Sequence, residues 1–228
     1  MPPTGAMPLR PPNRGLFAPI DGPIRSADCS ARRSTSTISL RARKPPGQSS
    51  VKQLLSEAQI RDGIERLAGE ISRHYAGRPL TIIGVLTGSV VLVADLIRRI
   101  DLPLRVGVIQ ARSYRGATTR PAELQIDHSM LPDIQGRNVL LIDDIFDTGH
   151  TLATVVAQVT ALHPRSVRSA VLLHKVGRQE VDFRPDHVAF EIPDVFVVGY
   201  GLDYQDAYRH LPYVAVLDPE DLTAGSGE

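Results

Sequence analysis

The chain has 228 residues, of which 42% are apolar, so it can bury a hydrophobic core and is not disordered throughout. Its 26 Lys and Arg residues and 25 Asp and Glu residues give a formal net charge of +1. A single cysteine, Cys29, excludes a disulfide framework and any multi-cysteine metal site.

Residues 1–50 differ from the rest of the chain in charge and composition. They hold eight basic residues, two acidic residues and nine of the 18 prolines, so a stretch of charge +6 precedes a body of charge −5. Because this stretch has no apolar periodicity, we predict that it is a disordered extension. An organelle transit peptide, a nucleic-acid-binding segment and a later start of translation are the alternatives. No signal-peptide core or membrane-spanning run is found, so a cytoplasmic location is expected.

The body, residues 51–220, alternates helix-like and strand-like segments. A capping box at Ser56 and Gln59, followed by apolar residues at helical spacing, predicts a helix that ends near Gly77. Strands are predicted at 80–85, 104–111, 138–142 and 167–173, and helices at 90–100 and 151–162. A polar stretch, 112–122, predicts an exposed mobile loop, and 188–216 predicts a smaller lobe of short strands. The alternation indicates an α/β fold with a mostly parallel sheet that helices cover on both faces.

The segment from Val139 to Leu152 is the most informative about function. An apolar strand leads into two adjacent carboxylates, Asp143 and Asp144, and a short polar turn then opens a helix. In open α/β sheets, ligands bind at the carboxyl ends of strands, and backbone N–H groups at a helix N-terminus bind anions. We therefore predict a phosphate site in this turn. The alternative is an ordinary surface turn, since Asp, Thr and Gly all favour turns.

The carboxylates beside this phosphate site need a separate explanation, because they would repel a phosphate. Neighbouring residues of a strand point to opposite faces, so Asp143 and Asp144 are expected to diverge and to be poorly placed to share a proton. Carboxylates accept hydrogen bonds from vicinal hydroxyl groups. A phosphate next to a diol indicates a ribose 5-phosphate ligand.

The segment resembles the phosphoribosyl-pyrophosphate motif of the type I phosphoribosyltransferases. Further segments narrow the resemblance to the hypoxanthine-guanine phosphoribosyltransferases: Val85-Leu86-Thr87-Gly88-Ser89, Ser113-Tyr114, Leu172-Leu173-His174-Lys175, and Asp194 to Tyr204 with Arg209. The resemblance covers about residues 51–220 and leaves 221–228 as a flexible C-terminus. It implies the type I phosphoribosyltransferase fold, a twisted, mostly parallel sheet flanked by helices with a small hood lobe.

This resemblance implies an enzyme that uses Mg²⁺ to transfer a 5-phosphoribosyl group to hypoxanthine or guanine and releases pyrophosphate. Asp147 is the implied general base or acid at purine N7. The implied phosphoribosyl-pyrophosphate ligands are Asp143, Asp144, Asp147, Thr148, Gly149, His150, Thr151, Thr87, Gly88 and Arg209. The implied purine contacts are Lys175, Phe196 and Val197, and the implied metal ligands are Asp143, Asp144 and Asp203. Ser113 and Tyr114 would begin a lid loop, and the Leu86–Thr87 peptide is expected to be cis.

Three of these assignments have a simpler alternative. Asp147 could cap a helix, Lys175 could be a solvated strand-end lysine, and Phe196-Val197 could belong to the core. Two residues depart from the family pattern. Asp143 stands where Glu is common, and Thr87 stands where Lys or Arg is common, so both could weaken binding of the phosphoribosyl donor.

Two other functions share this fold. An RNA-binding attenuator of pyrimidine operons would need a basic face, which a body of charge −5 does not favour. A non-catalytic sugar-phosphate binder is disfavoured because every implied catalytic position is filled. The expected partners are the phosphoribosyl donor, 6-oxopurine bases and further copies of the chain in a homodimer or homotetramer, with no membrane and no nucleic acid.

Overall fold

The computed structural model describes residues 52–113, 124–127 and 129–217, all within one unit of the chain, residues 45–228. The predictions for residues 1–50 and 221–228 lie outside the described residues, as does most of the loop predicted at 112–122. Residues 112 and 113 belong to a strand and not to the predicted loop. Within the described part, no helix is both long and apolar enough to cross a membrane.

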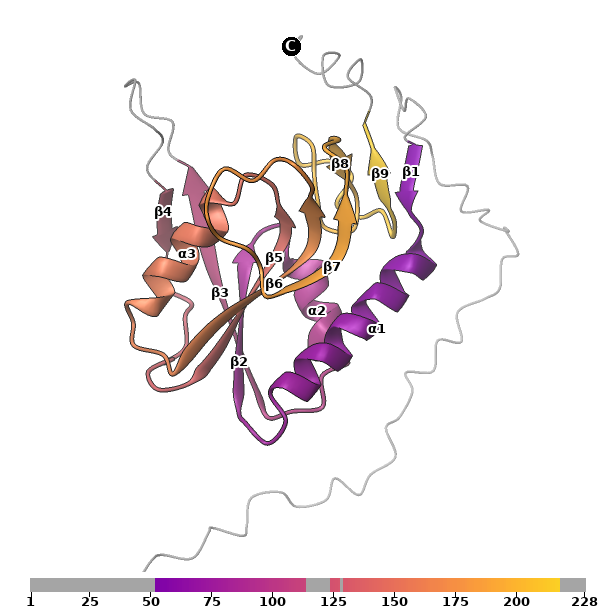
Figure 1. Cartoon of the computed structure of the whole chain (residues 1–228). Coiled ribbons are helices and arrows are strands. Elements are labelled where there is room, and N and C mark those ends of the chain that lie inside the picture. Colours follow the sequence, from indigo (N-terminus) through magenta and orange to yellow (C-terminus); the bar gives the residue numbers. More distant parts are fainter. Residues whose placement is uncertain (1–51, 114–123, 128, 218–228) are drawn as a thin grey trace, which may run out of the picture. The chain divides into compact units, whose positions relative to one another are not determined.

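Six strands form the main sheet, in the order β4-β3-β2-β5-β6-β7 (Figure 1). They are β2 (Leu80–Leu86), β3 (Leu104–Ser113), β4 (Leu124–Asp127), β5 (Asn138–Phe146), β6 (Ser166–Lys175) and β7 (His187–Ile192). Five of them are parallel, and β4 runs antiparallel to β3 at one edge. The predicted mostly parallel sheet is confirmed, although β4 was not predicted.

Helices cover both faces of this sheet, as predicted. The two helices α1 (Glu57–His74) and α2 (Val90–Ile97) lie on one face, and α3 (His150–Thr160) lies on the other (Figure 1). The predicted capping box begins α1: the Gln59 N–H donates to the Ser56 hydroxyl at 3.3 Å, and the Ser56 N–H donates to the Gln59 carboxamide at 2.9 Å. The helix α2 ends three residues before the predicted end, and Ile100 is buried in the turn that follows.

The core divides into two apolar clusters, one on each face of the sheet. Alternate residues of β5 enter different clusters: Leu140 and Ile142 pack with α1 and α2, whereas Val139 and Leu141 pack with α3. Because both faces are covered, the central strands are apolar without interruption, as parallel sheets require. This packing fixes the carboxyl ends of β2, β5 and β6, where the site lies.

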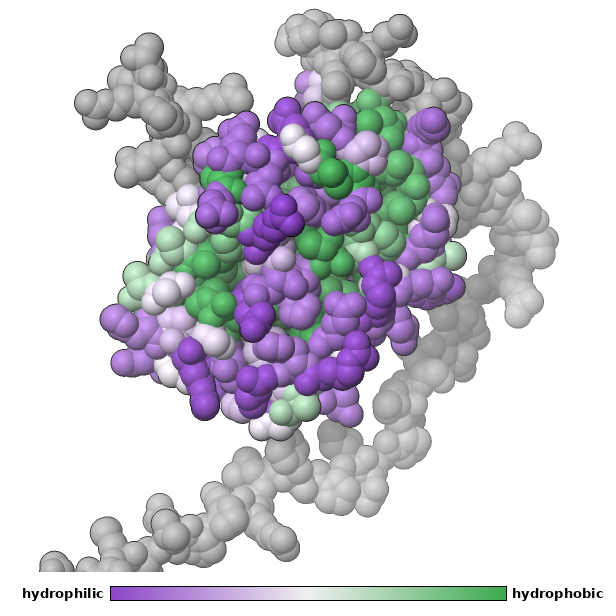
Figure 2. Space-filling view, in the orientation of Figure 1, coloured by the Kyte–Doolittle hydropathy of each residue, from purple (hydrophilic) through white to green (hydrophobic). Residues whose placement is uncertain are grey.

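A second, three-stranded antiparallel sheet forms a hood beside the carboxyl ends of the main strands (Figure 1). Its order is β1 (Lys52–Leu55), β9 (Val214–Val216), β8 (Val197–Val198). The predicted lobe at 188–216 is therefore only partly right. The strand β7 pairs with β6 in the main sheet, and β1 comes from the other end of the body. Figure 2 shows apolar side chains gathered over the part of the surface that Figure 1 assigns to the hood.

Candidate functional site

Two adjoining cavities lie at the carboxyl ends of the parallel strands. The first, of about 350 Å³, is lined by the end of β5, the start of α3, the turn after β2, and two hood residues. The second, of about 240 Å³, is lined by residues from β5, β6 and the hood. Four residues line both cavities: Asp144, Ile145, Asp147 and Asp203. The two cavities therefore form one continuous site.

The predicted phosphate turn lies where β5 gives way to α3. Gly149 occupies the N-cap position in a left-handed conformation with φ of 91°, and the helix begins at His150. Asp147 is therefore not the helix cap, and that alternative is wrong. Asp147, Thr148, Gly149 and Thr151 line the first cavity. His150 does not line it. Its exposed ring lies 3.1 Å from the Glu180 carboxylate.

No side chain other than hydrogen fits at Gly149. A Cβ atom there would lie 2.6 Å from Val181 Cγ2 and 2.7 Å from Phe146 Cζ. Phe146 is fully buried beneath the turn. The turn is therefore packed closely on its apolar support, and its backbone faces the cavity without a side chain in between.

Asp143 and Asp144 do not diverge, so this expectation is wrong. The alternation of faces along β5 changes here: Ile142 and Ile145, three positions apart, pack in the same apolar cluster. The two carboxyl groups between them interact, and both line the first cavity. Burial first, and then the neighbouring Asp144 charge, raise the pKa of Asp143 well above its usual range. Burial also raises the pKa of Asp144. The pair therefore lies in an environment that disfavours two negative charges.

The turn after β2 faces these carboxylates. The Leu86–Thr87 peptide is cis, as expected, and Thr87 and Gly88 line the first cavity. A Cβ atom at Gly88 would lie 1.6 Å from Asp144 Oδ2, so only glycine allows this close approach. The hood supplies the opposite wall through Arg209, whose Nη2 lies 2.7 Å from Asp203 Oδ1.

The second cavity contains the predicted purine contacts. Lys175, at the end of β6, is only 8% exposed, so the alternative of a solvated lysine is wrong. Phe196 is 39% exposed at the cavity, with its ring edge-on to Tyr204, whereas Val197 is buried in the hood sheet. The alternative core assignment therefore fits Val197 but not Phe196.

Asp147 lies between two cations. Lys175 Nζ is 3.2 Å from Asp147 Oδ2, and Arg178 Nε is 2.9 Å from Asp147 Oδ1. Burial would raise the pKa of Asp147, but the hydrogen bonds from Arg178 and Lys175 outweigh it and lower the pKa. Both cations also approach the Asp194 carboxylate, at 3.6 and 3.7 Å.

No role was predicted for Arg178 or Asp194 from the sequence. Arg178 follows β6 in an irregular segment, so no periodicity marks it, and its contact with Asp147 spans 31 positions. The predicted lid loop lies only partly within the described residues. Ser113 ends β3, and Tyr114 lies outside the described residues.

Among the residues that the structure describes, no group of three or more His, Cys, Asp or Glu side chains forms a ready metal site.

Comparison with known proteins gives a consistent result. The family model "Phosphoribosyl transferase domain" matches residues 50–205. Proteins named hypoxanthine-guanine phosphoribosyltransferase from Staphylococcus aureus and Staphylococcus epidermidis are 38% and 40% identical over 167 residues, which cover 73% of this chain and 93% of each relative. A crystal structure of hypoxanthine phosphoribosyltransferase from Staphylococcus aureus is similar with a TM-score of 0.70 and 38% identity, covering 74% of this chain and 92% of that one. A ternary substrates complex of a hypoxanthine phosphoribosyltransferase variant from Trypanosoma cruzi has a TM-score of 0.70 at 36% identity, covering 75% and 96%.

Proposed function

The chain belongs to the phosphoribosyl transferase family and, within it, to the hypoxanthine-guanine phosphoribosyltransferases, and we infer that it transfers the 5-phosphoribosyl group of phosphoribosyl pyrophosphate to hypoxanthine or guanine. The observation that carries this inference is the pair of joined cavities. One has a phosphate turn and two carboxylates, and the other has an aromatic ring and a buried lysine. A sugar phosphate and a planar base therefore fit side by side.

We propose that the first cavity binds the phosphoribosyl donor. The turn from Asp147 to Thr151 would bind the 5-phosphate through its backbone N–H groups and threonine hydroxyls. The carboxylates of Asp143 and Asp144 would accept hydrogen bonds from the ribose hydroxyls. Thr87, Gly88 and Arg209 would contact pyrophosphate from opposite walls. The exposed position of His150 supports a backbone contribution there and not a side-chain one.

We propose that the second cavity binds the base. Phe196 would stack on the purine ring, and Val197 would contact the base edge through its backbone. Lys175 would donate a hydrogen bond to the exocyclic O6. A 6-aminopurine has no acceptor at that position, so Lys175 would be left without a partner and the amino base would bind poorly.

The proposed reaction joins the purine nitrogen to the anomeric carbon as the bond from that carbon to pyrophosphate breaks. A neutral base must lose a proton in this step, and Asp147 lies at the junction of the two cavities, where it would accept the proton from N7. Lys175 and Arg178 hold the carboxylate deprotonated beforehand. The proton thus has an acceptor on the enzyme in the ground state.

We also propose Mg²⁺ as the cofactor. Mg²⁺ is usually held by one or two carboxylates together with substrate oxygens and water, so a complete protein cluster is not required. Asp143, Asp144 and Asp203 line the first cavity, where a bound cation would favour the ionised form of the two buried carboxyl groups, Asp143 and Asp144, whose pKa values burial raises. Bound there, Mg²⁺ would neutralise the charge of the departing pyrophosphate.

Three further assignments complete the proposal. A loop that begins at Ser113 and Tyr114 would close over the reacting groups and exclude water. The protein would act in the cytoplasm, and it would assemble as a homodimer or homotetramer. The domain would span residues 51–220.

The decisive experiment incubates the purified chain with phosphoribosyl pyrophosphate and Mg²⁺, and separately with hypoxanthine, guanine, xanthine, adenine or uracil. Nucleotide and pyrophosphate formation with hypoxanthine or guanine is expected, with loss of turnover when the cation is chelated. No turnover with either base would refute the inference. Turnover with uracil alone would instead favour a pyrimidine-specific relative of the same fold.

A further inference from the structure

The first cavity, called the donor cavity below, has two walls that come from distant parts of the chain. The second cavity is called the purine cavity. One wall of the donor cavity is the turn of Thr87 and Gly88, which leads directly into α2, and the other is the hood segment that carries Asp203 and Arg209. The two walls touch. A Cβ atom at Gly201 would lie 2.4 Å from the carbonyl oxygen of Gly88. The placement of the hood relative to α2 therefore sets how far Arg209 stands from Thr87 and Gly88.

Tyr200 lies in the hood segment that makes this contact. Gly199, Tyr200 and Gly201 have φ angles of 95°, 47° and 96°, three successive left-handed residues. Glycine adopts this conformation freely, but a tyrosine does so at a cost in free energy. Favourable side-chain contacts must offset that cost, and Tyr200 is only 7% exposed.

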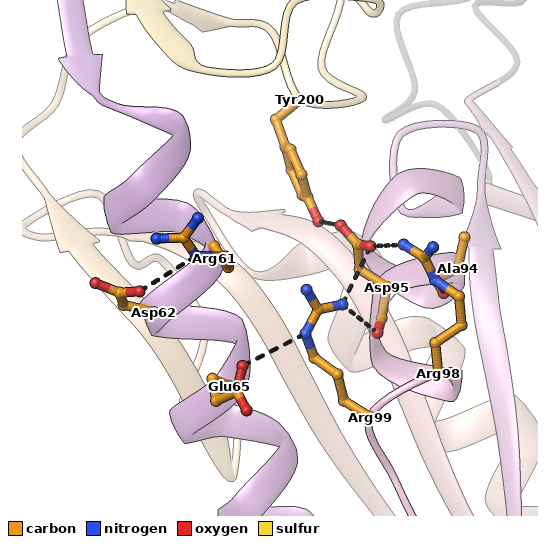
Figure 3. A network of polar contacts seen from close by, with 8 residues as sticks. All are labelled: Arg61, Asp62, Glu65, Ala94, Asp95, Arg98, Arg99 and Tyr200. Carbon is orange, nitrogen blue, oxygen red and sulfur yellow. Dashed lines mark hydrogen bonds and ion pairs between the residues drawn. The ribbon is translucent and has the colours of Figure 1, made fainter.

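The Tyr200 hydroxyl donates to Asp95 on α2, with 2.5 Å between Oη and Oδ2 (Figure 3). This is a direct side-chain hydrogen bond between the hood and the helix that follows the Thr87-Gly88 turn. It joins residues 105 positions apart. Such a bond to a charged acceptor is among the stronger ones in proteins.

Asp95 is itself held in place. Arg99 Nη1 lies 3.2 Å from Asp95 Oδ1, and Arg98 also contacts this carboxylate (Figure 3). Arg99 further approaches Glu65 of α1, at 3.9 Å from its Nε. Burial opposes the charged form, but the hydrogen bonds from Tyr200 and Arg98 lower the pKa of Asp95. At neutral pH the acceptor is therefore a fixed, ionised carboxylate.

The hydrogen bond between Tyr200 and Asp95 is linked to Arg209, the basic residue of the hood, through Gly201. Arg209 Nη1 donates to the carbonyl oxygen of Gly201 at 2.7 Å, and Gly201 adjoins Tyr200. The Gly201 N–H in turn donates to the Arg209 carbonyl at 3.0 Å. A displacement of Tyr200 would therefore move both the main chain and the guanidinium of Arg209.

We propose that Tyr200 and Asp95 form a positioning pair that holds the two pyrophosphate-binding walls at their working separation. Neither residue lines the donor or the purine cavity, so the pair acts through Arg209 and the Thr87-Gly88 turn. This proposal rests on the proposed role of Arg209 in pyrophosphate binding. It predicts a defect larger for the donor than for the base, because Thr87, Gly88 and Arg209 line the donor cavity and do not line the purine cavity.

The test is Tyr200→Phe, which removes only the hydroxyl. The KM for phosphoribosyl pyrophosphate should rise about tenfold, the loss typical of one hydrogen bond to a charged group, while the KM for hypoxanthine and kcat stay within about twofold. The matched control is Tyr213→Phe. That variant removes the hydroxyl of a half-buried hood tyrosine and should leave both KM values and kcat unchanged.

A second variant and a double-mutant cycle keep the test decisive. Asp95→Asn should also raise the donor KM, and combining it with Tyr200→Phe should add less than the sum of the two effects. If urea unfolding shows that Tyr200→Phe does not fold, Asp95→Asn alone tests the proposal. Equal rises in both KM values, a fall in kcat alone, or strict additivity would overturn the proposal.

Arg209→Gln separates this proposal from the one on which it rests. If Arg209→Gln leaves the donor KM unchanged, the role proposed for Arg209 is wrong. If Arg209→Gln raises the donor KM but Tyr200→Phe and Asp95→Asn do not, only the positioning pair is wrong.

Discussion

The phosphate turn can be tested by giving Gly149 a side chain. In Gly149→Ala the new Cβ would meet Val181 Cγ2 at 2.6 Å and two ring atoms of Phe146 at 2.7 and 2.9 Å. Its φ of 91° is also left-handed, which costs an L-residue about 1–2 kcal/mol. Overpacking in a closely packed region adds about 1–3 kcal/mol. We therefore expect the free energy of unfolding to fall by about 2–5 kcal/mol.

Gly136 provides the matched control. Its φ is 67°, but a Cβ atom there would meet nothing within 4 Å. Gly136→Ala should therefore cost only about 1 kcal/mol, since the conformational cost is partly offset by the lower entropy of the unfolded chain. Urea unfolding measures both variants, and the m-values should match the parent protein.

Removing the obstruction should restore part of the loss. In a Gly149→Ala, Val181→Ala double variant the closest contact disappears, so the two effects should not add. Gly149→Ala should also raise the KM for phosphoribosyl pyrophosphate more than that for hypoxanthine, because the turn must move away from its support. If Gly149→Ala and Gly136→Ala lose the same stability, the steric argument is refuted.

Three further predictions concern the carboxylates. Asp147→Asn should lower kcat at least about tenfold with little change in donor binding, and unchanged turnover would exclude a proton-accepting role. Arg178→Gln should raise the pKa of Asp147 and move the acid limb of the kcat/KM profile for hypoxanthine to higher pH, whereas Arg184→Gln, which changes another exposed arginine, should not. Because the pKa of Asp95 is lowered on folding, the stability that it contributes should be present above about pH 4 and lost as the pH falls further. Asp95→Asn should remove that part of the acid dependence of urea unfolding, and an unchanged dependence would contradict the assignment.

Local sequence signals predicted the parts of the fold that local interactions determine. The capping box of α1 and the apolar run of β5 each depend on residues close in the chain, so each can be predicted from a short stretch of sequence. The hood was only partly predicted because β1 pairs with β9 across about 160 positions, and β8 has only two residues. Such short strands carry no alternation that a single sequence could reveal.

The sequence predicted where the turn after β5 lies but not how the charged side chains around it pair. The strand-turn-helix order placed the phosphate turn, because the carboxyl ends of parallel strands meet at one edge. The pairing of Asp143 with Asp144 was missed, since strict alternation of faces assumes a regular strand and β5 changes its alternation at these residues. The pairing of Asp147 with Arg178 was also missed, because it depends on how an irregular segment after β6 folds back.

With the roles proposed above for Lys175 and Asp147, the hydrogen bond between them couples recognition of the base to proton transfer. In the free protein Lys175 donates to Asp147, and this hydrogen bond lowers the pKa of the carboxyl group and makes it a weaker base. A 6-oxopurine offers Lys175 a second acceptor, so the hydrogen bond to Asp147 weakens as the base binds. The proton affinity of Asp147 then rises when a proton must be accepted. A 6-aminopurine provides no such acceptor and leaves Asp147 a poor base, so discrimination should be larger in kcat/KM than in binding alone.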